Sequence, residues 1–316
     1  MIQTPPNLEQ LLEAHIQTLA LTLGPSSVDH YRSTARRFLA YLRATFPQLR
    51  RLSQLRRDPH LLGWFRSLSK QQPPLSNKTR IEHLIRLRRL LDDLAANGHA
   101  LQPPLIRRED FPPEPHYLPR PLSPQEDQLL QQELLRTDDL YANALLLMRA
   151  SGIRIGECIH LTLDCLRQLG TEQWALHVPL GKLHTERLVP ADTEVRRIIE
   201  RILTLRSSVP LARFTNSQGF LLPRRGARYA LVQTLLAALA RAAQRAGCFT
   251  HVTPHRLRHS FATEMLRLGV SLPALMQLLG HQDIRMTLRY YVQKVDMCSG
   301  CPKSPIVNAR AWLDSA

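Results

Sequence analysis

Six residues in the second half of the chain have side chains that could together cleave a phosphodiester without a metal ion. A pentacovalent phosphorus carries extra negative charge on its non-bridging oxygens, and guanidinium groups match these oxygens with paired donors. A tyrosine needs a base to take its proton before it can attack, and the departing sugar oxygen needs an acid. The residues of these types are Arg154, Lys182, His255, Arg258, His281 and Tyr290.

Two members of this set lie on one predicted helix. Thr253 can cap the free amides of a helix, and Pro254 fits its first turn. His255 and Arg258 are three residues apart, so they would share one face. Taken singly, His255 could be a capping residue, Arg258 a surface charge and Tyr290 a core aromatic. Only the combination indicates chemistry.

The complete set resembles the tyrosine recombinase, or phage integrase, family, which includes the Xer recombinases and many transposon integrases. In that family an Arg, a Lys on a β-hairpin, a His-x-x-Arg, a His within Leu-Gly-His and a Tyr nine residues later occur in this chain order. The same order occurs here between about 122 and 293, and Tyr290 lies nine residues after His281. Six typed positions in order form a far more specific pattern than one short motif.

The resemblance implies a role for each residue of the set. The two arginines and His281 would bind the phosphate oxygens, His255 would exchange the proton of the nucleophile, and Lys182 would protonate the leaving oxygen. Tyr290 would form a 3′-phosphotyrosyl intermediate, and neither a cofactor nor a metal ion is expected. Glu157 would accept hydrogen bonds that orient the site, as the acidic residue at this place does in the family; the alternative is a surface carboxylate.

The nucleophile has a neighbour of the same type. A helix is expected from Asp283 to Val292, and it would carry both Tyr290 and Tyr291. Successive helical residues point about 100° apart, so only one of them can face the phosphate. The spacing from His281 favours Tyr290, and whether Tyr291 can substitute for it stays open.

Arginine is the usual cation of this chain. The 42 basic residues give a formal charge of +16, which indicates a polyanionic partner, and only five of them are lysines. Lys182 therefore invites explanation, because lysine can release a proton when its pKa is lowered, whereas arginine stays charged. Strands are predicted over Trp174 to Val178 and Arg187 to Pro190, which would place Lys182 on a hairpin. An ordinary turn lysine is the alternative.

The predicted fold is mainly α with a small β-hairpin or sheet, arranged as a two-domain DNA clamp. Apolar stripes at helical spacing predict N-terminal helices, and between residues 31 and 90 there are 15 Lys or Arg but only two acids. Such an imbalance favours a face that binds DNA phosphates, and the unit resembles the family's core-binding domain in length and helix pattern. Eight prolines between 103 and 124 indicate a semi-rigid linker. The expected divisions are a core-binding domain (1–100), a linker (101–122), a catalytic domain (123–296) and a tail (297–316).

Three further segments carry expectations. The helix that begins after Arg154 is expected to continue to about Leu166, which would put Cys158 and Cys165 on it as small core residues. The stretch 207–228 is either a loop whose arginines contact phosphate or a solvated basic loop. Cys298 and Cys301 in the tail have the spacing of half a zinc site, but no second pair completes it.

The whole pattern predicts a site-specific recombinase that acts on double-stranded DNA for a mobile element, with a homo-tetramer on two recombining sites. The odd cysteine count and the lack of a signal or membrane-spanning segment predict a cytoplasmic protein. Two alternatives stay open. One is a type IB topoisomerase, which would relax DNA without exchanging strands, and the other is a DNA-binding regulator that has lost catalysis.

Overall fold

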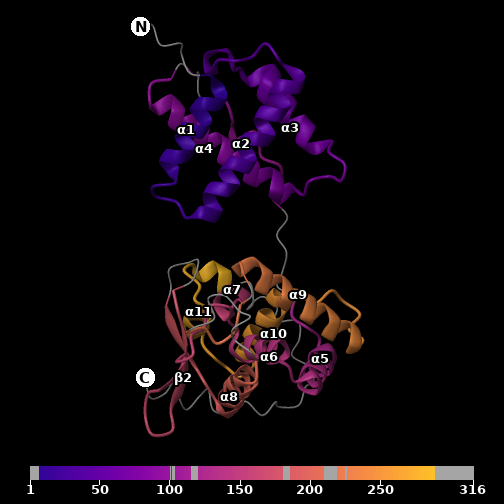
Figure 1. The fold of residues 1–316 in the computed structure, drawn as a ribbon. Helices are drawn as coiled ribbons and strands as arrows, with labels where there is room; N and C mark the ends of the chain where they lie inside the picture. Colours follow the sequence, from indigo (N-terminus) through magenta and orange to yellow (C-terminus); the bar gives the residue numbers. More distant parts are fainter. Residues whose placement is uncertain are drawn as a thin grey trace. The chain divides into compact units, whose positions relative to one another are not determined.

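A computed structural model of the chain divides into two compact units, Met1–Tyr117 and Leu118–Ala316 (Figure 1). Its described residues are 7–99, 101, 104–114, 120–180, 186–209, 219–224 and 226–288. Within these ranges the chain is mainly helical and contains one small antiparallel sheet. The predicted fold class is therefore confirmed.

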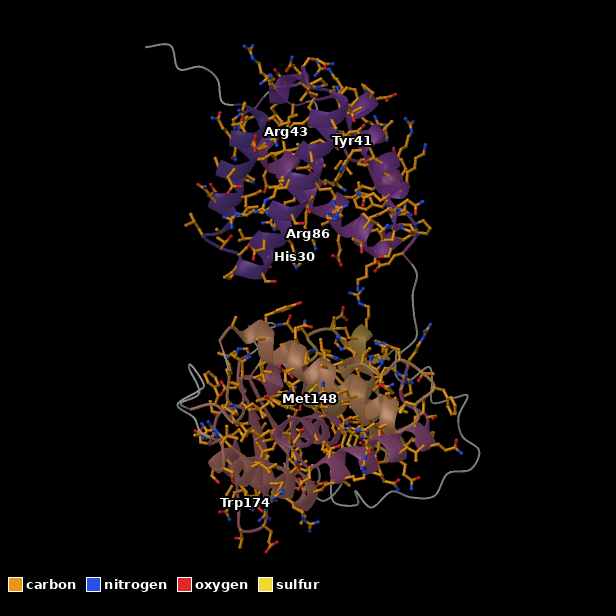
Figure 2. All side chains as sticks on the ribbon, turned by 45° about the vertical axis from the view of Figure 1, so that its right-hand side comes forward. His30, Tyr41, Arg43, Arg86, Met148 and Trp174 are labelled. Carbon is orange, nitrogen blue, oxygen red and sulfur yellow. The ribbon has the colours of Figure 1, made fainter. Side chains whose placement is uncertain are left out.

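The N-terminal unit is built from four α-helices: α1 (Leu8–Leu19), α2 (Pro25–Thr45), α3 (Leu62–Ser69) and α4 (Asn77–Ala96). Asn7 caps α1 by accepting a hydrogen bond from the amide of Gln10, as its sequence predicts. The apolar stripes meet in one core, where Phe38 and Trp64 are fully buried with their ring centroids 5.1 Å apart. In Figure 2, His30 lies toward one end of this unit and Tyr41 toward the other.

Part of the expected linker packs onto this unit. Leu105 and Ile106 are buried in the N-terminal core. The carboxylate of Asp110 accepts two hydrogen bonds, of 2.5 and 2.7 Å, from the guanidinium of Arg57. The core of the N-terminal unit therefore continues past residue 100.

The second unit surrounds one apolar helix. Its helices are α5 (Pro124–Thr137), α6 (Leu140–Ser151), α7 (Ile155–Cys158), α8 (Thr193–Ser207), α9 (Arg228–Arg245), α10 (Pro254–Arg267) and α11 (Leu272–Leu279). Residues 142–149 of α6 are all buried, and this helix packs against α5, α8, α9 and α10 (Figure 1). Met148, labelled in Figure 2, is one of them. Because this mainly apolar helix is buried, and its buried Arg149 is paired with Asp127 and Glu264, α6 is the helix around which the others pack.

The sheet of the second unit has three strands in the order β1 (Leu166–Gln168), β2 (Trp174–Val178) and β3 (Arg187–Pro190). Both neighbouring pairs are antiparallel, and Leu176 faces Leu166 on one side and Val189 on the other. The bounds of β2 and β3 are those that the sequence predicts. The hairpin tip, 181–185, lies outside the described residues.

One helix prediction is wrong. The helix after Arg154 ends at Cys158, and β1 begins at Leu166. The intervening backbone bonds to a distant segment instead, since the carbonyl of Leu161 accepts from the amide of Leu221 at 2.8 Å. Cys158 and Cys165 are both buried, as expected of core residues, but they do not share a helix. Burial raises the pKa of each thiol to about 12, so neither is a thiolate at neutral pH.

Candidate active site

Arg258 occupies the centre of the predicted site. Leu257 and Phe261, its neighbours on α10, are buried and fix the orientation of the helix. The guanidinium, only 3% exposed, donates one hydrogen bond of 2.6 Å to the carbonyl of Gly152 and another to the carbonyl of Leu279. These acceptors lie at the C-terminal ends of α6 and α11. The last carbonyls of a helix have no hydrogen-bond partner within it. Arg258 supplies such a partner at the ends of both helices, and these hydrogen bonds hold its charged group in position.

Gly152 permits this close packing. It ends α6 with a φ of +65°, in the left-handed region that favours glycine. A Cβ atom at this position would lie 2.2 Å from Cδ1 of Phe261. Glycine is therefore required both by the backbone conformation and by the aromatic ring that faces it.

Arg154 approaches the same region from the start of α7. Its Nη1 donates to Oε1 of Glu157 at 2.8 Å, and its backbone amide donates to Oε2 at 2.7 Å. Its Nη2 lies 3.4 Å from the carbonyl oxygen of Gly280, the residue that ends α11. Arg154 and Arg258 are thus both anchored to the last carbonyls of α11.

The carboxylate of Glu157 is the anchor of the cationic group. It is buried and also accepts hydrogen bonds of 3.1 and 2.9 Å from the guanidinium of Arg187. Burial alone would raise the pKa of Glu157, but the hydrogen bonds and charges of Arg187 and Arg154 hold it at about 2. The hydrogen bonds expected of Glu157 are therefore present, and this carboxylate is ionised at neutral pH.

Arg187 is a functional residue that the sequence analysis did not single out. It begins β3, and its Nε donates to the carbonyl of Leu278 at 2.8 Å while its other nitrogens hold Glu157. In the sequence it is only the first residue of a predicted strand. Its place in an otherwise apolar strand, Arg-Leu-Val-Pro, is the signal that could have indicated a partnered charge.

His281 follows Gly280, whose φ of +59° turns the chain at the end of α11. The ring Nδ1 lies 3.0 Å from Oγ1 of Thr287. Burial, and then the charges of Arg258, Arg154 and Arg187, lower the pKa of His281 to about 3. The ring is therefore neutral at pH 7, and if Nδ1 accepts from the threonine hydroxyl, Nε2 carries the hydrogen and can donate it to an anion.

His255 lies on the exposed side of the first turn of α10, one turn before Arg258. Its ring is stacked with that of His259 at a centroid distance of 6.4 Å and an interplanar angle of 28°. The structure thus brings together Arg154, Arg258 and His281 and places His255 on the same helix. Lys182, Tyr290 and Tyr291 lie outside the described residues.

The two arginines of the 207–228 stretch that the structure describes have different environments. Arg224 is buried, stacks on the ring of Phe220 at 3.8 Å and donates to the carbonyl of Ile159, so it contributes to packing. The expectation of a phosphate-contacting or solvated residue is wrong for this arginine. Arg228 is exposed at the start of α9, while Arg213 and Arg225 lie outside the described residues.

The arrangement can bind and polarise a phosphate group. Two guanidinium groups and a neutral imidazole with an N–H donor can stabilise charge that develops on phosphorus oxygens, without any change in their own protonation. Within the described residues no group of three or more His, Cys, Asp or Glu side chains could hold a metal ion. Cys298 and Cys301, whose spacing is that of half a zinc site, lie outside these residues.

The chain is similar to known proteins over most of its length. A family model described as the phage integrase family matches residues 124–297. The tyrosine recombinase XerD of Shewanella oneidensis is 29% identical over 89% of this chain and 91% of its own length. XerD of Lacticaseibacillus casei is 31% identical over 73% of this chain and 78% of its own length.

Solved structures show the same fold at lower identity. Lambda integrase in a dimer bound to a COC′ core site has a TM-score of 0.68 and 14% identity, covering 95% of this chain and 99% of that one. The Tn1549 transposon integrase with circular intermediate DNA has a TM-score of 0.68 and 18% identity, covering 97% and 99%. None of the helices in the described ranges is both long and apolar enough to serve as a membrane span.

Proposed function

The chain belongs to the phage integrase family and is a tyrosine-type site-specific DNA recombinase, and we propose that Tyr290 is the nucleophile that forms its covalent 3′-phosphotyrosyl intermediate. The observation that carries this assignment is the convergence of Arg154, Arg258 and His281 on the carbonyl-rich ends of α6 and α11. Tyr290 lies nine residues after His281 in the sequence. That spacing favours Tyr290 over Tyr291.

In the proposed cleavage step a different residue makes each proton transfer. The hydroxyl oxygen of Tyr290 bonds to phosphorus as the bond from phosphorus to the 5′-oxygen breaks. His255 accepts the tyrosine proton, and Lys182 gives a proton to the departing 5′-oxygen. The reverse sequence, with a 5′-hydroxyl from a partner strand as the attacking group, rejoins the DNA.

The two arginines stabilise the transition state of both directions. Arg154 and Arg258 pair with the non-bridging oxygens, and the Nε2–H of His281 donates to the same phosphate. Burial and the hydrogen bonds of Glu157 and Arg187 hold these groups before DNA arrives, so little reorganisation is needed on binding. The ester to tyrosine keeps the energy of the broken bond, which is why the proposal needs no nucleotide cofactor.

Double-stranded DNA is the proposed partner of both units. In the N-terminal unit some exposed arginines are neutralised, such as Arg43 by Glu9 and Arg88 by Asp92. Arg66 and Lys70, at the end of α3, are exposed and have no acidic partner among the described residues. Cations left without an internal counter-charge are suited to phosphate contacts, because DNA supplies the missing negative charge.

The contribution of these cations can be measured with a salt series. In fluorescence anisotropy, Arg66→Ala should weaken DNA binding and lower the slope of log K against log salt by about 0.9 for one lost phosphate contact. Arg43→Ala is the matched control and should change the slope less, because Glu9 already neutralises Arg43. Equal slopes for wild type and Arg66→Ala would remove Arg66 from the DNA-binding face.

The finer features of the function are also proposals. We propose that four copies act together on two recombining sites, as expected for strand exchange between two duplexes. We further propose that the recombinase serves a mobile element and acts on DNA in the cytoplasm. The genes and repeats that flank the coding region test whether the recombinase serves a mobile element.

A covalent trapping assay tests the nucleophile. With a nicked DNA substrate, wild type should form a protein–DNA adduct that survives denaturation, and Tyr290→Phe should form none while still binding DNA. Tyr291→Phe is the matched control and should keep adduct formation. Full trapping in Tyr290→Phe and loss in Tyr291→Phe would move the nucleophile by one residue, and trapping in neither wild type nor variants would refute the proposed chemistry.

A further inference from the structure

The helix that carries His255 and Arg258 also holds the junction segment, which we define as residues 120–122. The amide of Arg120 donates to Nδ1 of His259 at 3.1 Å, and the amide of Leu122 donates to Oγ of Ser260 at 2.8 Å. The guanidinium of Arg256 donates to the carbonyl oxygens of residues 120 and 121, both at 3.1 Å. Three polar residues of α10, Arg256, His259 and Ser260, thus bind a backbone segment rather than a substrate.

The hydrogen bond from Arg120 determines the state of the His259 ring. A backbone N–H can only donate, so Nδ1 of His259 must offer its lone pair and carry no proton. The hydrogen of the neutral ring is therefore on Nε2. Protonation of Nδ1 would place two N–H groups against each other, so the charged ring is incompatible with this contact.

His259 lies where its charge would matter for the proposed proton acceptor. Its ring is stacked with that of His255 at 6.4 Å. Burial, followed by the charges of His255 and Arg258, lowers the pKa of His259 to about 4. Arg256 on the same helix is a third positive neighbour, and the carboxylate of Glu126 on α5 lies 3.6 Å from Arg256.

We propose that His259 is a positioning residue for His255: burial keeps its ring neutral, the Arg120 amide holds the ring in one orientation with Nδ1 unprotonated, and this ring supports His255 as the group that accepts the tyrosine proton. The inference rests on the proposed function of His255. A charged His259 would make proton transfer from the tyrosine to His255 unfavourable. That transfer would put a second positive charge on the stacked pair of rings, and like charges repel. The junction segment would therefore position a catalytic residue through His259.

The test removes the backbone N–H of residue 120, which donates to His259. Arg120→Pro abolishes the amide donor but keeps the carbonyl that Arg256 binds, and the residue already lies between Pro119 and Pro121. Arg120→Ala loses the same side chain but keeps the donor, so it is the matched control. The rate of covalent complex formation on a nicked duplex would be measured in single turnover from pH 5.5 to 8, with DNA affinity measured separately.

We expect Arg120→Pro to react up to about tenfold more slowly than Arg120→Ala, which is the effect of losing roughly one hydrogen bond, and the ratio should be largest at pH 5.5, where the freed Nδ1 most readily accepts a proton. The difference should shrink toward pH 8, where His259 is neutral in both variants. DNA affinity should be unchanged. A rate difference that is the same at every pH would indicate a merely structural role and would overturn the proposal, as would identical profiles.

A second pair of variants keeps the proposal testable if the proline distorts the segment. In His259→Asn, the amide oxygen is attached to Cγ as Nδ1 is, so it can accept from Arg120 and cannot titrate. This variant keeps the acceptor but not the ring, so it should react more slowly than wild type but faster than His259→Leu, which loses both. Equal rates for the two would overturn the proposal. If wild type itself forms no covalent complex, the proposed function fails. If wild type reacts but the variants do not differ, only the role of His259 fails.

Discussion

The substitution Glu157→Gln removes the negative charge that holds two catalytic-site arginines in place while it keeps the shape of the side chain. The difference between the ordinary pKa of 4.5 and the folded value of about 2 corresponds to about 3 kcal/mol of preference for the charged form. The loss leaves Arg154 and Arg187 with a neutral acceptor, and one amide hydrogen then points at a guanidinium donor. We therefore expect the free energy of unfolding to fall by about 3 kcal/mol.

The substitution Glu157→Gln should slow cleavage more than it weakens DNA binding. With Arg154 no longer held, cleavage on a nicked duplex should slow by at least about tenfold, since a guanidinium that must reorganise stabilises the transition state less. Urea unfolding and single-turnover cleavage would be measured for the variant and for Glu133→Gln. Glu133 also binds two arginines, Arg136 and Arg245, but on α5. Its variant should cleave at the wild-type rate, and a wild-type rate in Glu157→Gln would refute the reasoning.

Two more predictions follow from the geometry. Gly152→Ala should slow cleavage strongly, because its Cβ would meet the ring of Phe261 at 2.2 Å. Gly269→Ala is the control: Gly269 has a φ of +89° but faces open space, so the substitution should cost about 1 kcal/mol of stability and leave the cleavage rate unchanged. The pKa values of His259 and His281, about 4 and about 3, lie below the unfolded value of 6.5, so the unfolded state binds more protons and stability falls as the pH drops below 6.5. Between pH 7 and pH 5 urea unfolding should show a loss of about 1 kcal/mol for each histidine, after allowance for solvent screening, and a pH-independent stability would contradict this.

Much of the fold could be predicted because local patterns and tertiary packing agree. The bounds of β2 and β3 agree with those predicted from the sequence. The helix after Arg154 could not be predicted to its end. Its residues have helical spacing, but the backbone around Leu161 forms hydrogen bonds with residues about sixty positions away, and a local pattern carries no information on such partners.

The candidate site was predictable as a set of residue types and not as a network. Arg154, Arg258 and His281 were found from their order in the chain, which reflects the chemistry they share. The role of Arg187 depends on the carboxylate of Glu157, and that of Gly152 on the guanidinium of Arg258 and the ring of Phe261. Such roles emerge only when α6, β3 and α11 meet.

The account rests most directly on the claim that the cationic groups and the nucleophile surround one phosphorus atom. A crystal structure of the full chain with nicked DNA and vanadate, which adopts the five-coordinate geometry of the transition state, measures this. The account predicts that Oη of Tyr290 coordinates the vanadium while Arg154, Arg258 and His281 donate to its equatorial oxygens. Vanadate coordinated by another residue, or bound away from these three side chains, would contradict it.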